Sequence, residues 1–528
     1  MAEFYSIRPG AALAPGGAPE VGNKAWNLMR MAEIGLPVPT AFVLPTHWCQ
    51  RPQPGHDAAL RQALTSGIAD LETANGLRFG AARRPLLVSV RSGAAVSMPG
   101  MMETILDVGL NADTVEGLIT LTGNPRLAWD SYRRLVQGYA EVVANQPAGP
   151  FEALVTAALL QADVENEREL DHRSLRSLTR AMLDCYRRLT GSDFPVDPHE
   201  QLTAAAAAVF RSWGAPKAVS YRRMNGIGDD AGTAVTVQTM VYGNAGGTSG
   251  AGVGFTRDPA TGAKAFYFDF QFNAQGEDVV SGRHVLRDNL RLPVVLPAVW
   301  ARLSEICHEL EKAFQDAQDF EFTVQSGTLF LLQTRRAKRT DWAALAIAVA
   351  MVEEGLLEPA EALVRLDGIK LDTVVRTSFA EPGSKPLAVA NVAGMGVAIG
   401  AMALDSAAAK RLAEAGTPVI LVRQNTETTD IEGVARAVGI LTATGGRTSH
   451  AAVVARQLGK VCLVGCPGLG IDISHRQCRI GATLLNEGDF LSLDGNTGAV
   501  YAGRLAPVTE RPERALATIA HWRRSEAA

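Results

Sequence analysis

The chain of 528 residues lacks several features that would place it in a functional class at once. Lys+Arg 51 nearly balance Asp+Glu 55, and the net charge of -4 gives no overall attraction to nucleic acid or to an anionic membrane. The N-terminus lacks a basic segment followed by an apolar one, and the longest apolar run, Ala343–Val352, is too short to cross a bilayer. We therefore expect a cytoplasmic protein that binds neither nucleic acid nor membrane.

Paired cysteines are also missing. The six cysteines form no C-x-x-C motif, which favours reduced, structural thiols in a chain of this kind. Cys462, Cys466 and His475 invite a zinc interpretation, but their spacing fits no strong template, and we expect no zinc there. With 47% hydrophobic and 6% aromatic residues, the composition is that of an ordinary globular protein. Its length predicts about three compact units.

Alternating patterns indicate strands and helices along the whole chain. A helical, charged region over 112–202 separates an early strand at Pro85–Val90 from a second group of strands. That group is predicted at Ala234–Val241, Ala265–Phe270, Phe320–Val324 and Leu329–Leu332, and the last two read as a hairpin. A helical connector over Arg335–Asp367 follows, then a turn at Gly368 and a hinge at Pro382–Pro386. Beyond it we expect a β/α domain with strands at Pro418–Val422, Val438–Leu441, Val461–Val464 and Phe490–Asp494, and a helical tail from Arg511.

The most informative segment is Thr444–His450, a glycine-rich turn that ends in a histidine. The next residues, Ala451–Leu458, have apolar side chains at helical spacing. A histidine between such a turn and a helix N-terminus lies beside N–H groups that stabilise phosphate oxygens, and Arg447 and Ser449 add a charge and a hydroxyl. From the residues alone, the alternative is a capping loop in which Thr448 or Ser449 caps the helix and the histidine is incidental.

Four clusters in the first 340 residues fit phosphate chemistry. Lys24 follows Gly22-Asn23 and opens a helix-like stretch, Arg91 lies at a strand end, and Thr104 ends the small-residue loop Ser97–Thr104. In the fourth cluster, strand alternation places Asp319, Glu321 and Thr323 on one face of the hairpin, whose other strand carries Gln333. These oxygens suit Mg²⁺. The alternatives are a solvated lysine and acidic residues that keep a strand edge soluble.

Taken in order, these segments resemble the pyruvate phosphate dikinase family of phosphoenolpyruvate-utilising enzymes. The resemblance runs through Ser89–Asp107, Asn124–Val143 and Gln318–Arg335 and continues into the histidine motif. It implies an α/β and α+β multidomain fold: an ATP-grasp nucleotide-binding domain with a helical insertion, a helical linker, and a swivelling β/α phosphohistidine domain. The corresponding boundaries are 1–111 and 203–340 for the nucleotide-binding domain, 112–202 for the insertion, 341–384 for the linker, 385–507 for the phosphohistidine domain and 508–528 for the tail.

The resemblance also implies the site residues. ATP contacts are expected from Lys24, Arg91, Gly100, Thr104, Gln238, Glu321, Gln333 and Arg335. Mg²⁺ is expected at Glu321, Asp319 and Gln333, and the catalytic residues are expected to be His450, Arg447 and Ser449. Asp269 stands where the family typically has glutamate. Ser449 is similar to the residue of the phosphate-dependent dikinases, whereas Arg447 differs from the methionine that they usually have. The resemblance favours phosphate as second acceptor and leaves water as the alternative.

The implied reaction moves the β,γ-pyrophosphoryl group of ATP to His450 and releases AMP. Inorganic phosphate then accepts the terminal phosphoryl group, pyrophosphate is released, and phosphohistidine remains. Because the family continues into a pyruvate- and phosphoenolpyruvate-binding barrel that this sequence lacks, we expect an acceptor subunit or protein in trans. Two alternatives stay open: a phosphotransferase for another small molecule such as a phenol, and a nucleotide-sensing phosphocarrier or regulatory protein. The sequence leaves homo-oligomerisation open.

Overall fold

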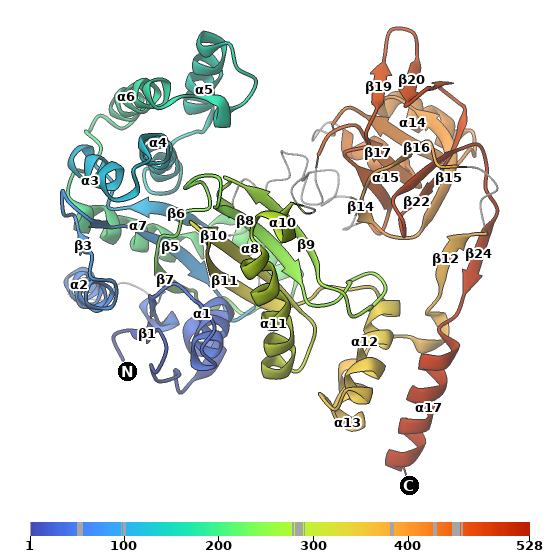
Figure 1. Cartoon of the computed structure of the whole chain (residues 1–528), viewed down its shortest axis with the longest axis horizontal. Coiled ribbons are helices and arrows are strands. Elements are labelled where there is room, and N and C mark those ends of the chain that lie inside the picture. The colour runs from blue at the N-terminus through green and yellow to red at the C-terminus, as the bar shows by residue number, and fades with distance from the viewer. Residues whose placement is uncertain are drawn as a thin grey trace. The chain divides into compact units, whose positions relative to one another are not determined.

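The computed structural model describes residues 2–49, 56–96, 98, 102–276, 279, 289, 291–380, 385–425, 430–445, 455 and 458–527. Contacts within the chain divide it into two compact units, one made of Met1–Gly250 and Phe320–Arg335, the other of Ala251–Asp319 and Arg336–Ala528. Both units mix helices and sheets, so the expected α/β multidomain class is confirmed at this level (Figure 1). The finer division into six segments stays a prediction. No helix in the described part of the chain combines the length and apolar character needed to cross a bilayer.

The first unit contains an antiparallel five-stranded sheet of order β1-β2-β7-β5-β6. Its strands are β1 (Tyr5–Ile7), β2 (Ala41–Leu44), β7 (Ala234–Thr239), β5 (Val88–Gly93) and β6 (Thr104–Val108). Apolar residues of one face, such as Val88, Val90, Val235 and Val237, join the main core. The helices nearest the sheet in sequence are α1 (Gly17–Glu33), α2 (His56–Asn75), α7 (Pro198–Ser212) and α8 (Pro216–Met224). The opposite face of β5 and β7 carries the polar residues discussed below.

The helical segment predicted after Asn111 begins with four α-helices, three of which start at a side-chain cap. These are α3 (Ala112–Thr122), α4 (Pro125–Val142), α5 (Gly149–Ala162) and α6 (His172–Thr190), and α4, α5 and α6 lie together in Figure 1. Asn111 caps α3 by accepting from the N–H groups of Asp113 and Thr114, and Gly123 ends it in the left-handed conformation. Val115 and Leu118 of α3 are buried, although Leu121 of the same helix is 43% exposed.

The predicted hairpin is formed by β10 (Gln318–Gln325) and β11 (Thr328–Arg336), in a four-stranded sheet of order β11-β10-β8-β9. Its turn residues Ser326 and Gly327 both have positive φ, as a tight two-residue hairpin turn requires. The remaining strands are β8 (Gly250–Phe255) and β9 (Tyr267–Phe272). The prediction of helix from Arg335 is wrong at its start, because β11 continues to Arg336 and the next helix begins at Asp341.

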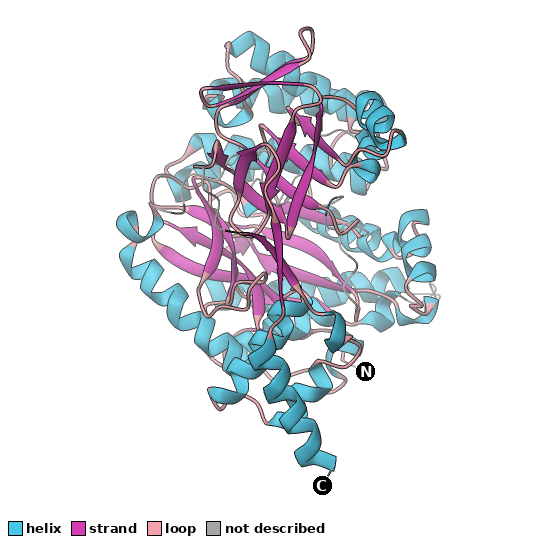
Figure 2. Ribbon diagram, turned by 90° about the vertical axis from the view of Figure 1, so that its right-hand side faces the viewer, coloured by secondary structure: helices cyan, strands magenta, loops and turns pink. Residues whose placement is uncertain are grey.

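The second unit contains a cluster of helices around one apolar core. It includes α12 (Asp341–Glu353), α13 (Pro359–Arg365) and the C-terminal helix α17 (Glu513–Ala527), which Figure 2 shows ending at the C-terminus. Ile519 and Trp522 of α17 pack in the same core as Leu345 and Val349 of α12. Next to this core, β12 (Arg376–Phe379) pairs antiparallel with β24 (Pro507–Glu510). The unit also contains the short helix α10 (Leu292–Val295) and α11 (Pro297–Phe314).

The expected β/α domain is an eight-stranded mixed sheet of order β13-β23-β22-β15-β16-β17-β18-β14. Its central strands β15 (Val397–Ala403), β16 (Val419–Arg423), β17 (Gly439–Thr442) and β18 (Val461–Val464) are parallel. Neighbouring residues Ile420 and Leu421 belong to different cores, so both faces are covered, which explains the continuous apolar runs. The domain is completed by β13 (Ala388–Val389), β14 (Asn391–Gly394), α14 (Ser406–Glu414), α15 (Ile431–Arg436), β19 (Leu469–Asp472), β20 (Gln477–Ile480), β21 (Thr483–Asn486), β22 (Phe490–Asp494) and β23 (Ala499–Ala502).

Candidate functional site

The position of Lys24 depends on a break in helix α1 at Gly22. Gly22 has φ 76° and ψ 151°, a conformation that favours glycine. A Cβ at this position would lie 2.1 Å from the carbonyl oxygen of Gly93, so the backbones approach too closely for any other residue. The next residue, Asn23, donates its N–H to the carbonyl of Ala94 at 2.9 Å. The break therefore fixes Lys24 against the end of strand β5.

Arg91 on β5 contacts residues of two other strands, β7 and β10. Its Nη1 donates to Oε1 of Gln238 on β7 at 3.4 Å, and its Nη2 lies 3.7 Å from Oε2 of Glu321 on β10. Asn27, three residues after Lys24 on α1, donates from Nδ2 to the carbonyl of Thr334 on β11 at 2.8 Å. The structure thus gathers three predicted residues, from β5, β7 and β10, in one place, and it ties the helix that carries Lys24 to β11.

Positive charge exceeds negative charge in this cluster. The pKa of Lys24 is lowered from its ordinary 10.5 to about 7. Burial is the largest cause, Arg91 and Arg335 also lower this pKa, and Glu321 partly offsets them. Three cations therefore surround one carboxylate, while Lys24 keeps part of its surface exposed. A desolvated lysine beside two guanidinium groups suits a polyanionic ligand, because phosphate oxygens would supply negative charge.

The structure places most of the other predicted residues of this half on β6, β10 and β11. Thr104 opens β6 directly opposite Arg91, and Gln333 and Arg335 share one face of β11. Asp319 is buried on β10 and shares the face of Glu321, as the strand alternation predicted. Gly100 lies outside the described residues. Asp269 lies on β9, where Asn289 donates to its Oδ1 at 3.4 Å.

Sequence reasoning missed two residues that lie next to this site. Asn27 was not expected, although its spacing of three residues from Lys24 on a helix was a usable signal. Thr236 was also missed: it is fully buried and stands directly opposite Arg91 in the β5–β7 pairing. No motif marked it, because a threonine in a strand is ordinary.

The beginning of the histidine motif follows the carboxyl end of β17, a parallel strand between β16 and β18. Thr444 is held there, since its N–H and its hydroxyl both donate to the carbonyl of Gln424. The carboxyl ends of parallel strands are common places for ligand sites. Arg447, Ser449 and His450 themselves lie outside the described residues, so their roles stay predictions.

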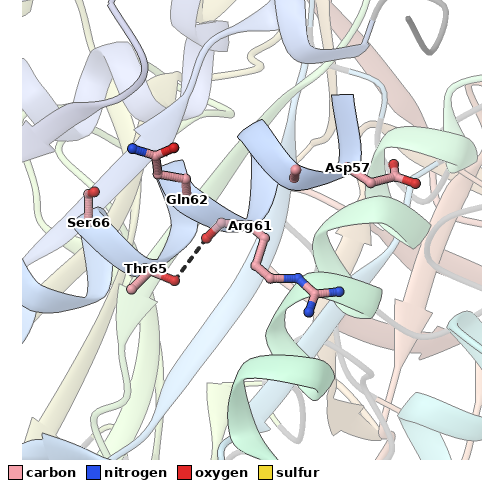
Figure 3. Close-up of a pocket in the computed structure, with 6 residues that line it drawn as sticks. Asp57, Arg61, Gln62, Thr65 and Ser66 are labelled. Atoms are coloured by element: carbon pink, nitrogen blue, oxygen red, sulfur yellow. Dashed lines mark hydrogen bonds between the residues drawn. The ribbon is translucent and has the colours of Figure 1, made fainter. Parts of the chain in front are cut away.

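A hollow of about 540 Å³ lies elsewhere, along α2. Figure 3 shows its lining side chains projecting from this single helix; they are Asp57, Ala58, Arg61, Gln62, Thr65 and Ser66. Thr65 donates its hydroxyl to the carbonyl of Arg61 within the helix. None of the predicted site residues lines the hollow, and the candidate site is the charged cluster around Lys24.

Two family models match separate segments of the chain. Residues 55–294 match the family described as pyruvate phosphate dikinase, AMP/ATP-binding domain, and residues 416–498 match the mobile domain of PEP-utilising enzymes. The chain thus resembles, in order, an AMP/ATP-binding domain and the mobile domain of PEP-utilising enzymes. The resemblance to the pyruvate phosphate dikinase family of phosphoenolpyruvate-utilising enzymes, predicted from the motifs, is confirmed.

The relatives are similar over nearly the whole chain. The chain is 44% identical to pyruvate, phosphate dikinase of Clostridium symbiosum over 490 residues, which is 92% of this chain and 56% of that protein. It is 42% identical over 511 residues to the enzyme of Giardia intestinalis, covering 95% of this chain and 58% of the relative. For the chloroplastic enzyme 1 of Arabidopsis thaliana the identity is 41%, covering 95% and 53%. The chain spans little more than half the length of these relatives.

Proposed function

We propose that the chain is an ATP-dependent, dikinase-type phosphotransferase that phosphorylates its own histidine. The β,γ-pyrophosphoryl group of ATP passes to His450 and AMP is released; inorganic phosphate then takes the terminal phosphoryl group as pyrophosphate. The remaining phosphoryl group then passes to a pyruvate-type acceptor. The observation that carries this proposal is the cluster of Lys24, Arg91, Arg335 and Glu321, which has more cations than carboxylates and lies in a chain that also contains a mobile-domain match.

The cluster would bind the phosphates of ATP mainly by charge. Arg91 has two weak contacts, at 3.4 and 3.7 Å, so its guanidinium can turn from Gln238 and Glu321 to phosphate oxygens. Lys24 is partly neutral at pH 7, and the charge of a triphosphate would raise its pKa and protonate it. Transfer of a phosphoryl group depends largely on such positioning and charge neutralisation.

The residues on the hairpin also fit a magnesium ion. Glu321 and Gln333 offer hard oxygen ligands, and Asp319 lies on the same face of β10 as Glu321. Within the described part of the chain, no group of three or more His, Cys, Asp or Glu residues could hold a metal by protein ligands alone. Such a site fits Mg²⁺, which usually shares its coordination with substrate phosphates and water. When bound, Mg²⁺ would neutralise charge on the phosphates.

His450 would act as the nucleophile through its neutral imidazole, which is available near pH 7. A nitrogen–phosphorus bond to the β-phosphorus forms while the bond from that phosphorus to the bridging oxygen of AMP breaks, and AMP leaves with this oxygen. Arg447 and the Ser449 hydroxyl would stabilise the new phosphoryl oxygens. We infer an ATP-grasp architecture for the nucleotide-binding part and a swivelling β/α domain for the histidine, with hinges near Gly368 and in 382–386.

A single-turnover experiment tests the proposed function. Excess chain is mixed with MgATP, and AMP is measured over time with and without inorganic phosphate. We expect one equivalent of AMP in both cases and pyrophosphate mainly when phosphate is present. Glu321→Gln should bind Mg²⁺ and ATP less well and form AMP more slowly, whereas Glu358→Gln, an exposed control on the second unit, should behave as wild type. ADP as the sole nucleotide product would overturn the dikinase assignment.

A further inference from the structure

Two buried polar atoms without partners face the same side of the sheet at the candidate site. Thr236 is 0% exposed, and within the described structure its hydroxyl oxygen makes no hydrogen bond. The Nε of Arg91 is likewise buried and lacks a partner among those residues. The two residues are directly opposite each other in the antiparallel β5–β7 pairing, so their side chains emerge on the same face. One atom is a donor and the other can accept.

Leaving such atoms unpaired is unfavourable, and native proteins seldom do so without a reason. A valine would fill the space of Thr236 without a buried hydroxyl. The neighbouring Thr239 shows the usual solution in the same strand, since its hydroxyl is 3.0 Å from that of Thr40 and also lies near Asn75. Thr236 therefore carries a polar group that the present arrangement of the site does not use.

We propose that Thr236 is a positioning residue for Arg91, and that its hydroxyl accepts a hydrogen bond from Arg91 Nε when nucleotide phosphates engage the guanidinium. The inference rests on the proposed function. Arg91 now points its two terminal nitrogens at Gln238 and Glu321 through long contacts of 3.4 and 3.7 Å. Turning these nitrogens toward phosphate rotates Nε as well, and Thr236 is the acceptor across the strand pair. The bond fixes the plane of the guanidinium, which matters because arginine binds phosphate through a flat, two-pronged set of donors.

The position of Thr236 under the cluster explains why it acts through Arg91 and not on the ligand directly. It lies beside buried Gln238 on the same face of β7, and its hydroxyl oxygen is shielded from solvent. A group in this place can orient a side chain that reaches the ligand but cannot itself reach a ligand in solution. The expected consequence is an effect on nucleotide binding without a loss of folded stability.

The test compares Thr236→Val with Thr236→Ser by calorimetric titration of the full chain with MgATP. We expect Thr236→Val to weaken ATP binding about tenfold, as loss of one hydrogen bond to a charged group would, and Thr236→Ser to stay within about twofold of wild type. Because valine removes an unpaired hydroxyl, the melting temperature of Thr236→Val without nucleotide should equal or exceed that of wild type. Thr239→Val, the matched control, should lower the melting temperature and leave ATP affinity unchanged.

A double-mutant cycle separates positioning from other causes. Arg91→Lys keeps a positive charge at position 91 but removes the guanidinium Nε–H that would donate to Thr236. Thr236→Val should therefore cause no further loss of ATP affinity in the Arg91→Lys background. An equal loss of ATP affinity in both backgrounds, or an unchanged ATP affinity in Thr236→Val, would overturn the positioning role. The proposed function would still stand in that case, provided that the wild-type chain binds ATP. A wild-type chain that does not bind MgATP would overturn both proposals.

Discussion

Replacing Lys24 with methionine should make the protein more stable while it removes the proposed ATP function. Lys24 is held by the Gly22 break in a place where burial and Arg91 disfavour its charge, and its pKa falls from 10.5 to about 7. When the chain folds at neutral pH, the Lys24 amine must therefore either lose its proton or be buried as a charged group, and both cost free energy. Methionine has a similar length and an apolar stem, so it fills the same space without that cost.

The size of the effect follows from the pKa. A fall from 10.5 to about 7, at about 1.4 kcal/mol per pKa unit, gives an upper limit of about 5 kcal/mol. Lys24 is partly exposed, so solvent screening reduces this figure, and we expect Lys24→Met to raise the free energy of unfolding by about 1–3 kcal/mol at pH 7. The same variant should bind MgATP at least tenfold more weakly.

The pH dependence provides the sharper test. Between pH 7 and 10.5 Lys24 is protonated in the unfolded chain but largely neutral in the folded chain. The contribution of Lys24 to the free energy of unfolding of the wild type therefore rises with pH. The advantage of Lys24→Met is therefore largest at pH 7 and below, and it disappears as pH approaches 10. Urea unfolding of both proteins at pH 6.5, 8 and 9.5 measures it. A variant that is less stable than wild type at pH 6.5, or a difference that grows with pH, would refute the reasoning.

Two further predictions concern backbone and buried charge. Gly22→Ala should lower the free energy of unfolding by roughly 2–4 kcal/mol and weaken ATP binding, because the added Cβ would lie 2.1 Å from the carbonyl oxygen of Gly93. Urea unfolding measures the stability and calorimetry the ATP affinity, and a variant as stable as wild type would contradict the close approach. Arg257→Met should lower the free energy of unfolding by about 3–5 kcal/mol, because it leaves the buried carboxylate of Glu311 without its two hydrogen bonds of 2.8 and 2.9 Å. Thermal unfolding should show that the double variant Arg257→Met/Glu311→Leu recovers most of this stability, and no recovery would argue against the ion pair as the cause.

Much of the fold could be predicted where local chemistry decides it. The strands at Val461–Val464 and Phe490–Asp494 have the predicted bounds, because continuous apolar runs favour buried strands. The hairpin β10–β11 was predictable from its Ser326-Gly327 turn. Strand β8 was missed, since its sequence Gly-Ala-Gly-Val-Gly-Phe has little strand propensity and is a strand only through its neighbours.

The candidate site was predictable in its residue types but not in its geometry. Lys24, Arg91 and Glu321 were expected near phosphate, and the structure places their charges within range of one another. The reason Gly22 must be glycine could not be predicted, because its close partner Gly93 lies far along the sequence. The same holds for Thr236, whose importance depends on the strand that pairs with its own. Long-range pairing, and not local pattern, decides both.

The central claim is that ATP bound at the Lys24 cluster phosphorylates His450, and one labelling measurement tests it most directly. The chain is incubated with Mg²⁺ and ATP labelled in the β-phosphate, then denatured in base and digested, and the labelled peptide is identified. The account predicts an acid-labile, base-stable label on the peptide that contains His450, and none in His450→Ala, whose ATP affinity should stay near wild type. Label retained in His450→Ala, or no label in a wild-type chain that binds MgATP, would contradict it.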